Sequence, residues 1–197
     1  PIPEGTSTYV TDVYGGNMDL YTFYVREWWE DLTALAEEYG IRYTATILEN
    51  NDTDVEPPYE EQGTHNRYQY FLSLLMEMGG DVGLYGYNQQ PLCLADNPLT
   101  RAYEGEEQDY EEGLGLRYWS SRENMAAALT EAQRFQKSIL GGTDMRVYTP
   151  PSNIWSEDGI QAVKETLPDI QAVAGGYVDA GYSHGEEFRV DEDGMIY

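Results

Sequence analysis

The chain has 197 residues, of which 41% are hydrophobic, so it is long enough for one domain with a sizeable core. Its 36 acidic residues outnumber its 11 basic residues and give a formal net charge of -25. Such a charge repels nucleic acid phosphates and anionic lipid surfaces, so we exclude both as partners, whereas a polymer that carries free amino groups would be attracted.

The cysteine count and the hydropathy of the sequence exclude further classes of protein. The single cysteine, Cys93, excludes an internal disulfide framework and a thiolate metal cluster, because either needs a second cysteine. The sequence has no apolar run of about 18 residues, so we expect no membrane insertion by this segment. It begins at Pro1 without an initiator methionine or signal-peptide regions, and we expect a single domain, residues 1–197, excised from a longer chain.

The first predicted elements are a strand at residues 7–14 and a helix that ends near Tyr39, before Gly40. Apolar residues on this helix recur at steps of three and four and predict one wide face packed on a sheet. The residues of this face are Tyr21, Val25, Trp28, Trp29, Leu32, Leu35, Ala36 and Tyr39.

A second strand is predicted at residues 41–48 and a third at residues 82–87, with a helix between them. This helix places Tyr68, Phe71, Leu72, Leu75 and Met78 on one side, and Gly79 and Gly80 end it. The alternation of strand and helix is typical of βα units that build a parallel sheet or barrel.

The C-terminal half continues the alternation. Ser120 with Glu123 forms a capping-box signature for a third helix, and Ser156 is the predicted cap of a fourth helix that Pro168 closes. The third helix should direct inward Met125, Ala128, Leu129, Ala132, Phe135 and Ile139. Strands are predicted at residues 146–149 and 170–174, and residues 187–197 predict a hairpin added outside the main sheet.

Residues 38–47 and 79–92 resemble two motifs of a known family, the NodB-type polysaccharide deacetylases. Residues 38–47 are similar to that family's join between a helix and a strand, and residues 79–92 are similar to its histidine motif. The resemblance implies an α/β fold, a distorted or incomplete (β/α) barrel of the glycoside hydrolase and deacetylase type. It also implies a site at the carboxyl ends of the strands, where the family holds zinc or a similar divalent ion.

The departures from the family pattern change the expected chemistry. The two histidine positions hold Tyr85 and Gln89, which are poor ligands for zinc. Asp12 would match a metal ligand, whereas Thr11 replaces the catalytic base and cannot take a proton at neutral pH. Thr149 stands where the family has an arginine before the proline pair. We therefore expect no cofactor and leave the catalytic residues undefined, with Thr11 at the base position.

A carbohydrate-binding role is the functional interpretation of these replacements. Tyrosine rings stack on sugar rings, and amides and carboxylates bind hydroxyl groups. The expected substrate-binding residues at the strand ends are Tyr85, Tyr87, Asn88, Gln89, Glu49, Asn51, Tyr148 and Asn153. The structural alternative is that Tyr85 and Gln89 fill a former cleft while Tyr87 and Tyr148 are packing aromatics.

The predicted function is a non-catalytic, deacetylase-like domain that binds a polysaccharide, including a cationic or amino-sugar polymer, or that supports exopolysaccharide and cell-surface assembly. The resemblance implies an extracellular or cell-surface location. One alternative is an active metal-dependent deacetylase of an N-acetylhexosamine polymer, in which non-standard ligands hold zinc; Asp12, His65 and His184 are the candidates. Another alternative is a protein-interaction scaffold.

Overall fold

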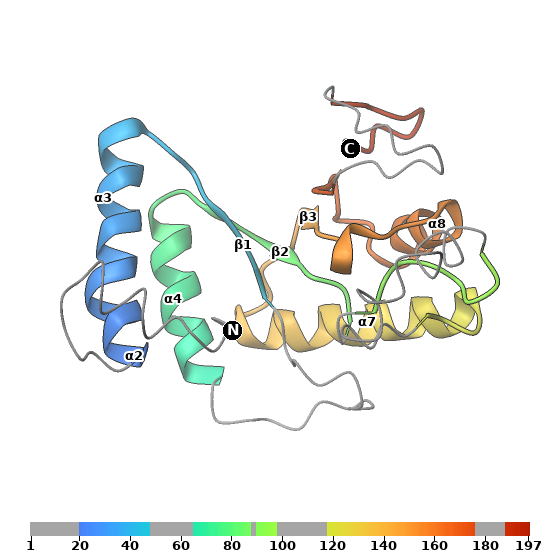
Figure 1. The fold of residues 1–197 in the computed structure, drawn as a ribbon, viewed down its shortest axis with the longest axis horizontal. Helices are drawn as coiled ribbons and strands as arrows, with labels where there is room; N and C mark the ends of the chain where they lie inside the picture. Colours follow the sequence, from blue (N-terminus) through green and yellow to red (C-terminus); the bar gives the residue numbers. More distant parts are fainter. Residues whose placement is uncertain (1–19, 48–64, 88–89, 98–117, 176–187) are drawn as a thin grey trace, which may run out of the picture.

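The computed structural model of the chain describes residues 20–47, 65–87, 90–97, 118–175 and 188–197. In this part of the chain, four strands form one sheet, all in parallel pairs and in the order β1-β2-β3-β4 (Figure 1). The strands are β1 (Thr44–Ile47), β2 (Asp81–Leu84), β3 (Val147–Tyr148) and β4 (Ala172–Val173).

The prediction of a parallel α/β fold is confirmed, but the described strands form an open sheet and not a closed barrel. The sheet runs from β1 to β4 without a bond that joins its two outer strands among the described residues. The first predicted strand, residues 7–14, lies outside the described residues. The barrel therefore stays a prediction, whereas the parallel sheet is observed.

The first helix is a continuous run of α2 (Leu20–Phe23), η1 (Tyr24–Trp28) and α3 (Trp29–Tyr39), in which η1 is a π-helical turn. Gly40 ends it with a left-handed φ of 65°. The wide sheet-facing side predicted for this helix is only partly correct, because Trp28, Leu35 and Tyr39 keep 40%, 44% and 66% of their surface exposed. A helix buries one stripe against the layer beneath it, and here that stripe runs through Trp29 and Ala36.

Helix α4 (His65–Glu77) packs on the sheet through Leu72 and Leu75, which lie with Val82 of β2 and Ile139 in one small core cluster. Phe71 contacts Trp29 of α3, with ring centroids 5.4 Å apart. Figure 1 shows α3 and α4 together at one end of the sheet, far from α8. Both predicted helices of the N-terminal half are therefore present.

Helix α7 (Arg122–Ile139) buries the apolar face that the sequence predicted for it, although Phe135 is only partly buried. Its cap differs from the prediction. Ser121, not Ser120, accepts the capping hydrogen bond, from the Asn124 N–H at 3.2 Å. The Ser120 hydroxyl accepts instead from the Asn124 side-chain amide. Adjacent serines offer the same capping chemistry, so sequence alone shifts the helix start by one residue.

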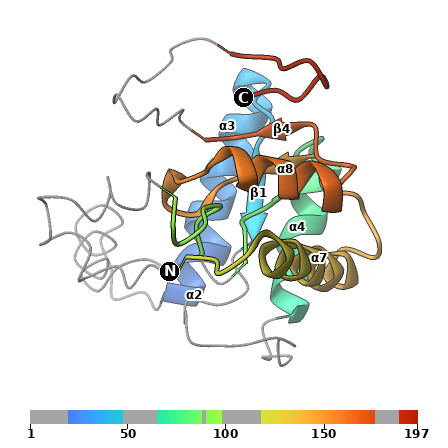
Figure 2. The ribbon, with the colours of Figure 1, turned by 90° about the vertical axis from the view of Figure 1, so that its right-hand side faces the viewer.

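Helix α8 (Glu157–Thr166) begins as predicted, with the Ser156 hydroxyl accepting from the Gly159 N–H at 3.1 Å. The two C-terminal helices share the main core with the sheet, and in Figure 2 α8 lies in front of α3 and α7 in front of α4. The strand register puts Leu84, Tyr148 and Val173 on one face, and all three belong to this core. The main core therefore lies between the sheet and the α7–α8 pair.

The C-terminal segment, residues 188–197, is a hairpin as predicted, with Val190 and Ile196 paired in antiparallel fashion. It does not lie outside the main sheet, however. Ile196 pairs in parallel with Ala172, and its carbonyl accepts from the Val173 N–H at 2.8 Å. The hairpin therefore extends the sheet beyond β4, because the edge of β4 offers unpaired backbone groups to it.

None of the described helices combines the length and the apolar character that a membrane-spanning segment requires.

Candidate functional site

The loops that follow β2, β3 and β4 meet at the carboxyl edge of the sheet. Hydrogen bonds between consecutive strands fix them, because the Thr149 N–H donates to the Leu84 carbonyl at 2.8 Å and the Ala174 N–H donates to the Tyr148 carbonyl at 2.7 Å. Each loop therefore starts beside the end of the neighbouring strand. We define the carboxyl-edge site as residues 85–87, 149–153 and 174–175, the part of this edge that the structure describes.

Gly86 lies at a close approach between the first two loops of this site. Its φ is 57°, a left-handed value that favours glycine. A Cβ at Gly86 would lie 2.4 Å from Pro151 Cγ and 3.2 Å from the Tyr148 hydroxyl oxygen. The turn after β2 thus fits directly against the proline pair after β3, and only a glycine allows this approach.

Two residues of the second loop have strained backbones. Ser152 and Asn153 have φ values of 53° and 59°, in the left-handed region that non-glycine residues seldom adopt. The Asn153 N–H donates to the Pro150 carbonyl at 3.0 Å and fixes the turn. The Asn153 Oδ1 lies 2.9 Å from where a Cβ of Gly175 would be, so the amide group sits against the loop after β4. Such strain clusters at functional sites.

The three predicted tyrosines differ in their burial. Tyr85 is half-buried, whereas Tyr87 and Tyr148 expose 3% and 0% of their surface and belong to the main core. The Tyr87 ring packs near Trp119, with centroids 6.0 Å apart. This burial favours a packing role for Tyr87 and Tyr148, and it leaves Tyr85 as the tyrosine of this site that is only half-buried.

Most other predicted site residues lie outside the described residues: Thr11, Asp12, Glu49, Asn51, Asn88, Gln89 and His184. His65 is the first residue of α4, which follows β1 and so begins on the carboxyl side of the sheet. Of the predicted set, the structure places Tyr85 and Tyr87 in the segment after β2 and Asn153 in the loop after β3, and Gly86 and Pro151 are the residues at which these two segments approach each other.

The chemistry of the carboxyl-edge site is that of neutral polar groups. Its members offer the Tyr85 phenol, the hydroxyls of Thr149 and Ser152, and the Asn153 amide. Zinc prefers imidazole, thiolate or carboxylate ligands, so this donor set does not fit the ion that the family resemblance implies. Within the described part of the chain, no group of three such side chains gathers anywhere. The site as described can bind hydroxyl or amide groups of a ligand.

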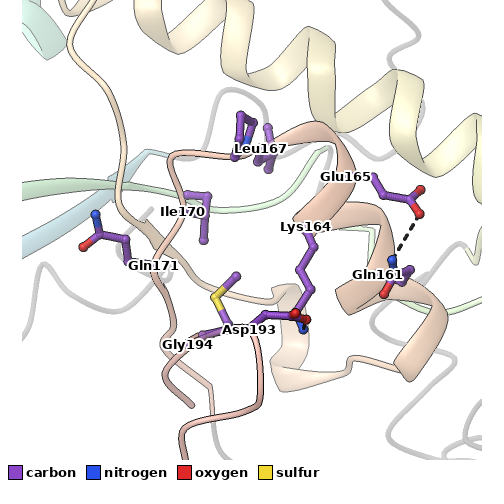
Figure 3. A pocket seen from close by; sticks show the side chains of 10 residues that line it. Gln161, Lys164, Glu165, Leu167, Ile170, Gln171, Asp193 and Gly194 are labelled. Atoms are coloured by element: carbon purple, nitrogen blue, oxygen red, sulfur yellow. Dashed lines mark hydrogen bonds and ion pairs between the residues drawn. The ribbon is translucent and has the colours of Figure 1, made fainter.

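A separate cavity of about 500 Å³ lies between α8, the loop before β4 and the C-terminal hairpin (Figure 3). On its wall, Lys164 Nζ lies 2.6 Å from carboxylate oxygens of both Asp191 and Asp193. The Tyr197 hydroxyl donates to Asp191 at 2.8 Å. The composition of the tail gave no signal of this cluster, because Lys164 lies 27 residues before Asp191 in the sequence.

The electrostatics of this cluster tie the hairpin to α8. The bond to Lys164 holds the pKa of Asp191 well below its ordinary value, and the two carboxylates raise the pKa of Lys164. Burial, followed by the bond to Asp191, raises the pKa of Tyr197 to about 12. The Tyr197 ring also stacks on Trp155, with centroids 5.3 Å apart and an interplanar angle of 10°.

Fold and site together define an α/β protein with a parallel sheet, a helical layer against it and a neutral polar site at its carboxyl edge. Residues 1–197 match a family described as "Uncharacterised protein conserved in bacteria (DUF2194)", and the chain belongs to that family. No curated protein matches the sequence.

Two solved structures are similar to the chain. One is the wild-type BA3943 protein of Bacillus anthracis, described as a CE4 family pseudoenzyme, and the other is a mutant of it. Each superposes with a TM-score of 0.45 and 10% sequence identity over 75% of this chain. The chain spans 38% of the wild-type chain and 39% of the mutant chain.

Proposed function

We propose that the chain is a divergent polysaccharide deacetylase-like domain that binds carbohydrate at the carboxyl-edge site without hydrolysing it. One observation carries the proposal: Gly86, from the segment that resembles the histidine motif, packs against Pro151, from the segment that resembles the proline motif. Segments that lie more than 60 residues apart in the sequence thus meet at the edge where parallel α/β proteins bind ligands.

The side chains at this contact support binding rather than hydrolysis. Deacetylation by the family mechanism needs a metal ion and a base, and the position that should hold a histidine after β2 is Tyr85. A neutral phenol neither replaces an imidazole as a zinc ligand nor takes a proton at neutral pH. The same phenol is well suited to a sugar, since its ring stacks on the apolar face of a pyranose and its hydroxyl exchanges hydrogen bonds with sugar hydroxyls.

Asn153 supplies the second contact in this proposal. Its left-handed backbone directs the amide toward Gly175, between the loops after β3 and β4. An amide both donates and accepts, so it matches a hydroxyl or an N-acetyl group without a charge. Because the chain carries a net charge of -25, a polymer with free amino groups would be favoured over an anionic one. We place the domain in a cell-surface or exopolysaccharide system on the motif resemblance alone.

Calorimetry with chitooligosaccharides tests the binding. We expect N-acetylated or partly deacetylated oligomers to bind the native chain, and Tyr85→Ala and Asn153→Ala to weaken binding about tenfold each, as is ordinary for a contact of about 1.4 kcal/mol. Tyr70→Ala is the matched control, because Tyr70 is an exposed tyrosine on α4 outside the site. Equal weakening by Tyr70→Ala, or no binding at all, would refute the proposal.

Zinc titration and acetate release separate this function from an active deacetylase. We expect no acetate release by the native chain, and zinc affinity only after the double substitution Tyr85→His with Gln89→His. Tight zinc binding by the native chain with acetate release would instead assign catalysis, with Asp12, His65 and His184 as the first ligands to replace.

A further inference from the structure

The C-terminal hairpin presents different side chains on its two faces. Arg189 and Tyr197 exchange backbone hydrogen bonds of 3.0 and 2.7 Å, and Val190 is paired with Ile196. Successive side chains of a strand point to opposite faces, so this register puts Phe188, Val190 and Ile196 on one face. We call these three residues the hairpin outer face. They expose 91%, 61% and 41% of their surface, so this face is apolar and open to solvent.

The inner face of the hairpin is anchored to the rest of the fold. Met195 is 7% exposed and belongs to the main core, and the Tyr197 ring stacks on Trp155. Asp191 pairs with Lys164 of α8. Figure 1 draws the hairpin, in red, at the end of the molecule opposite to α3 and α4. The outer face thus stands on a fixed support, and such a surface loses little conformational entropy when a partner covers it.

The outer strand of the hairpin, residues 188–191, is an open edge of the sheet. The Ile196 N–H donates to the Gln171 carbonyl at 3.0 Å, and the Ile196 carbonyl accepts from the Val173 N–H at 2.8 Å. Val190 lies opposite Ile196 and directs its own N–H and C=O away from the sheet, since the groups of such a pair point outward on both sides. Neither Phe188 nor Val190 makes a backbone hydrogen bond to another described residue. Unpaired backbone groups beside an apolar face form a template for one more strand.

We propose that this edge is a docking site for an extended segment of a partner protein, which adds a strand beside residues 188–191. The backbone selects a strand as the occupant. An extended segment can pair with both outward groups of Val190, whereas a helix has already paired its own backbone groups. The hairpin outer face requires apolar residues at alternate positions of that segment, because these positions share one face of a strand.

The turn of the hairpin adds a preference for charge. Glu192 is exposed and has no ion pair with another described residue. A lysine or arginine near one end of the added segment would pair with this carboxylate and fix the direction of the segment. A second copy of the chain would instead bring a net charge of -25 against the same charge, and an anionic lipid surface would be repelled as well. None of these residues belongs to the carboxyl-edge site, so docking is a function beyond carbohydrate binding.

Fluorescence anisotropy with synthetic peptides tests the docking. The probe is a labelled peptide of about eight residues, in which valine alternates with threonine and one end carries a lysine. Two matched peptides carry N-methyl groups on alternate amides, each on a different set. One set faces the edge and the other faces solvent, so we expect one methylated peptide to bind about tenfold more weakly than the parent and the other to bind unchanged. Equal effects of the two methylation patterns would overturn the proposal.

Substitutions in the full chain locate the binding. Val190→Pro removes an outward N–H and leaves the bonds between the two hairpin strands in place, so we expect about tenfold weaker peptide binding. Phe188→Ser should weaken binding by a similar factor, and Glu192→Gln should mainly reduce its salt dependence. The matched control is Met76→Thr, which replaces an apolar side chain that is 37% exposed on α4 and should leave peptide binding unchanged. Equal weakening in Met76→Thr and Phe188→Ser would refute the location.

Hydrogen exchange in the native chain needs no variant. The Val190 amide should exchange fast in the free chain and about tenfold more slowly with saturating peptide, whereas the Tyr197 amide, already bonded within the hairpin, should change little. Unchanged exchange at Val190 in the peptide complex would overturn the proposal. A dimer of the native chain in sedimentation that Phe188→Ser abolishes would also overturn it, in favour of a second copy at this edge.

Discussion

The two edges of the sheet are built with different chemistry. At the amino edge, Arg146 pairs with Asp81 at 2.9 Å, and Lys137 pairs with Asp144 at 2.7 Å and with Asp169 at 3.3 Å. At the carboxyl edge, the residues of the carboxyl-edge site include no charged side chain and are fixed by backbone hydrogen bonds, a glycine contact and two left-handed residues.

This contrast indicates that the two edges of the sheet have different roles. Ion pairs with exposed members contribute only tenths of a kcal/mol each, so the amino edge tolerates change and mainly orders the loops between helices and strands. Backbone strain and close packing at the carboxyl edge cost free energy. Proteins retain such strain where the geometry of a site is needed for its function. Parallel α/β proteins bind their ligands at the carboxyl edge.

The substitution Gly86→Ala should have the largest effect, because the added Cβ would lie 2.4 Å from Pro151 Cγ at a left-handed backbone position. We expect a loss of about 3 kcal/mol in the free energy of unfolding, measured with urea, and a loss of sugar binding. Gly141→Ala is the control, because Gly141 also has a φ of 65° but no atom within 4 Å of the added Cβ. It should cost about 1 kcal/mol, from the backbone alone. Equal losses of stability in the two variants would show that the close contact of Gly86 with Pro151 adds nothing to the cost of the substitution.

Replacing Lys164 by methionine should release the hairpin from α8. The cluster with Asp191 is only partly exposed, and we expect a loss of about 1–2 kcal/mol. The readout is hydrogen exchange at the Val173 and Ile196 amides, which should speed up in Lys164→Met and far less in Asp193→Asn, because Asp193 is 74% exposed. Protection of both amides that survives Lys164→Met would show that β pairing alone holds the tail.

The same cluster predicts a pH dependence. Since the pKa of Asp191 is lowered on folding, its contribution is present above its ordinary pKa of about 4 and is lost as the pH falls through the lowered value. The pKa of Lys164 is raised, so its contribution is present below about pH 10 and is lost as the pH rises beyond that value. Hairpin protection should therefore be constant between these limits and fall at both extremes; a change near neutral pH would contradict the assignment.

The substitution Ser152→Gly should stabilise the chain slightly, because glycine accepts a φ of 53° without the steric cost that serine pays. We expect a gain of about 0.5–1 kcal/mol in urea unfolding. Sugar binding should weaken at most twofold, since the substitution relaxes the loop without removing the Asn153 amide. A loss of stability would mean that the serine side chain has a role that outweighs its backbone strain.

The smallest effect should follow Arg146→Gln at the amino edge. Arg146 is 58% exposed, so its pair with Asp81 should contribute about 0.5 kcal/mol at low salt and less as salt is added. Sugar binding should not change. A clear loss of sugar binding in Arg146→Gln would show that the amino edge also contributes to ligand binding.

Sequence reasoning predicted what depends on local pattern. The alternation of βα units, the inward face of α7 and the Ser156 cap follow from apolar spacing and from one side chain, and the structure bears them out. It placed Tyr85 and Asn153 in one region by motif resemblance, and the loops that carry them meet through Gly86 and Pro151.

Features that depend on contacts between distant segments were missed. Apolar spacing on α3 cannot say how many of the apolar residues a layer beneath will cover, so the exposed Tyr39 was expected inside. The hairpin was predicted outside the sheet because its bond to β4 joins Ile196 to Gln171 and Val173, residues with no shared local signal. The left-handed φ of Ser152 is likewise set by packing and is not coded by serine itself.

The order of the strands across the sheet has a consequence for how the molecule is made. Because β1 to β4 are neighbours in space in the same order as in the sequence, each crossover between them joins adjacent strands, and none of these four strands must wait for a distant partner. A chain that leaves the ribosome from its N-terminus can add one βα unit at a time to an existing edge. The hairpin at residues 188–197, which covers β4, follows β4 in the sequence, so a chain interrupted between the two would leave the β4 edge open to aggregation.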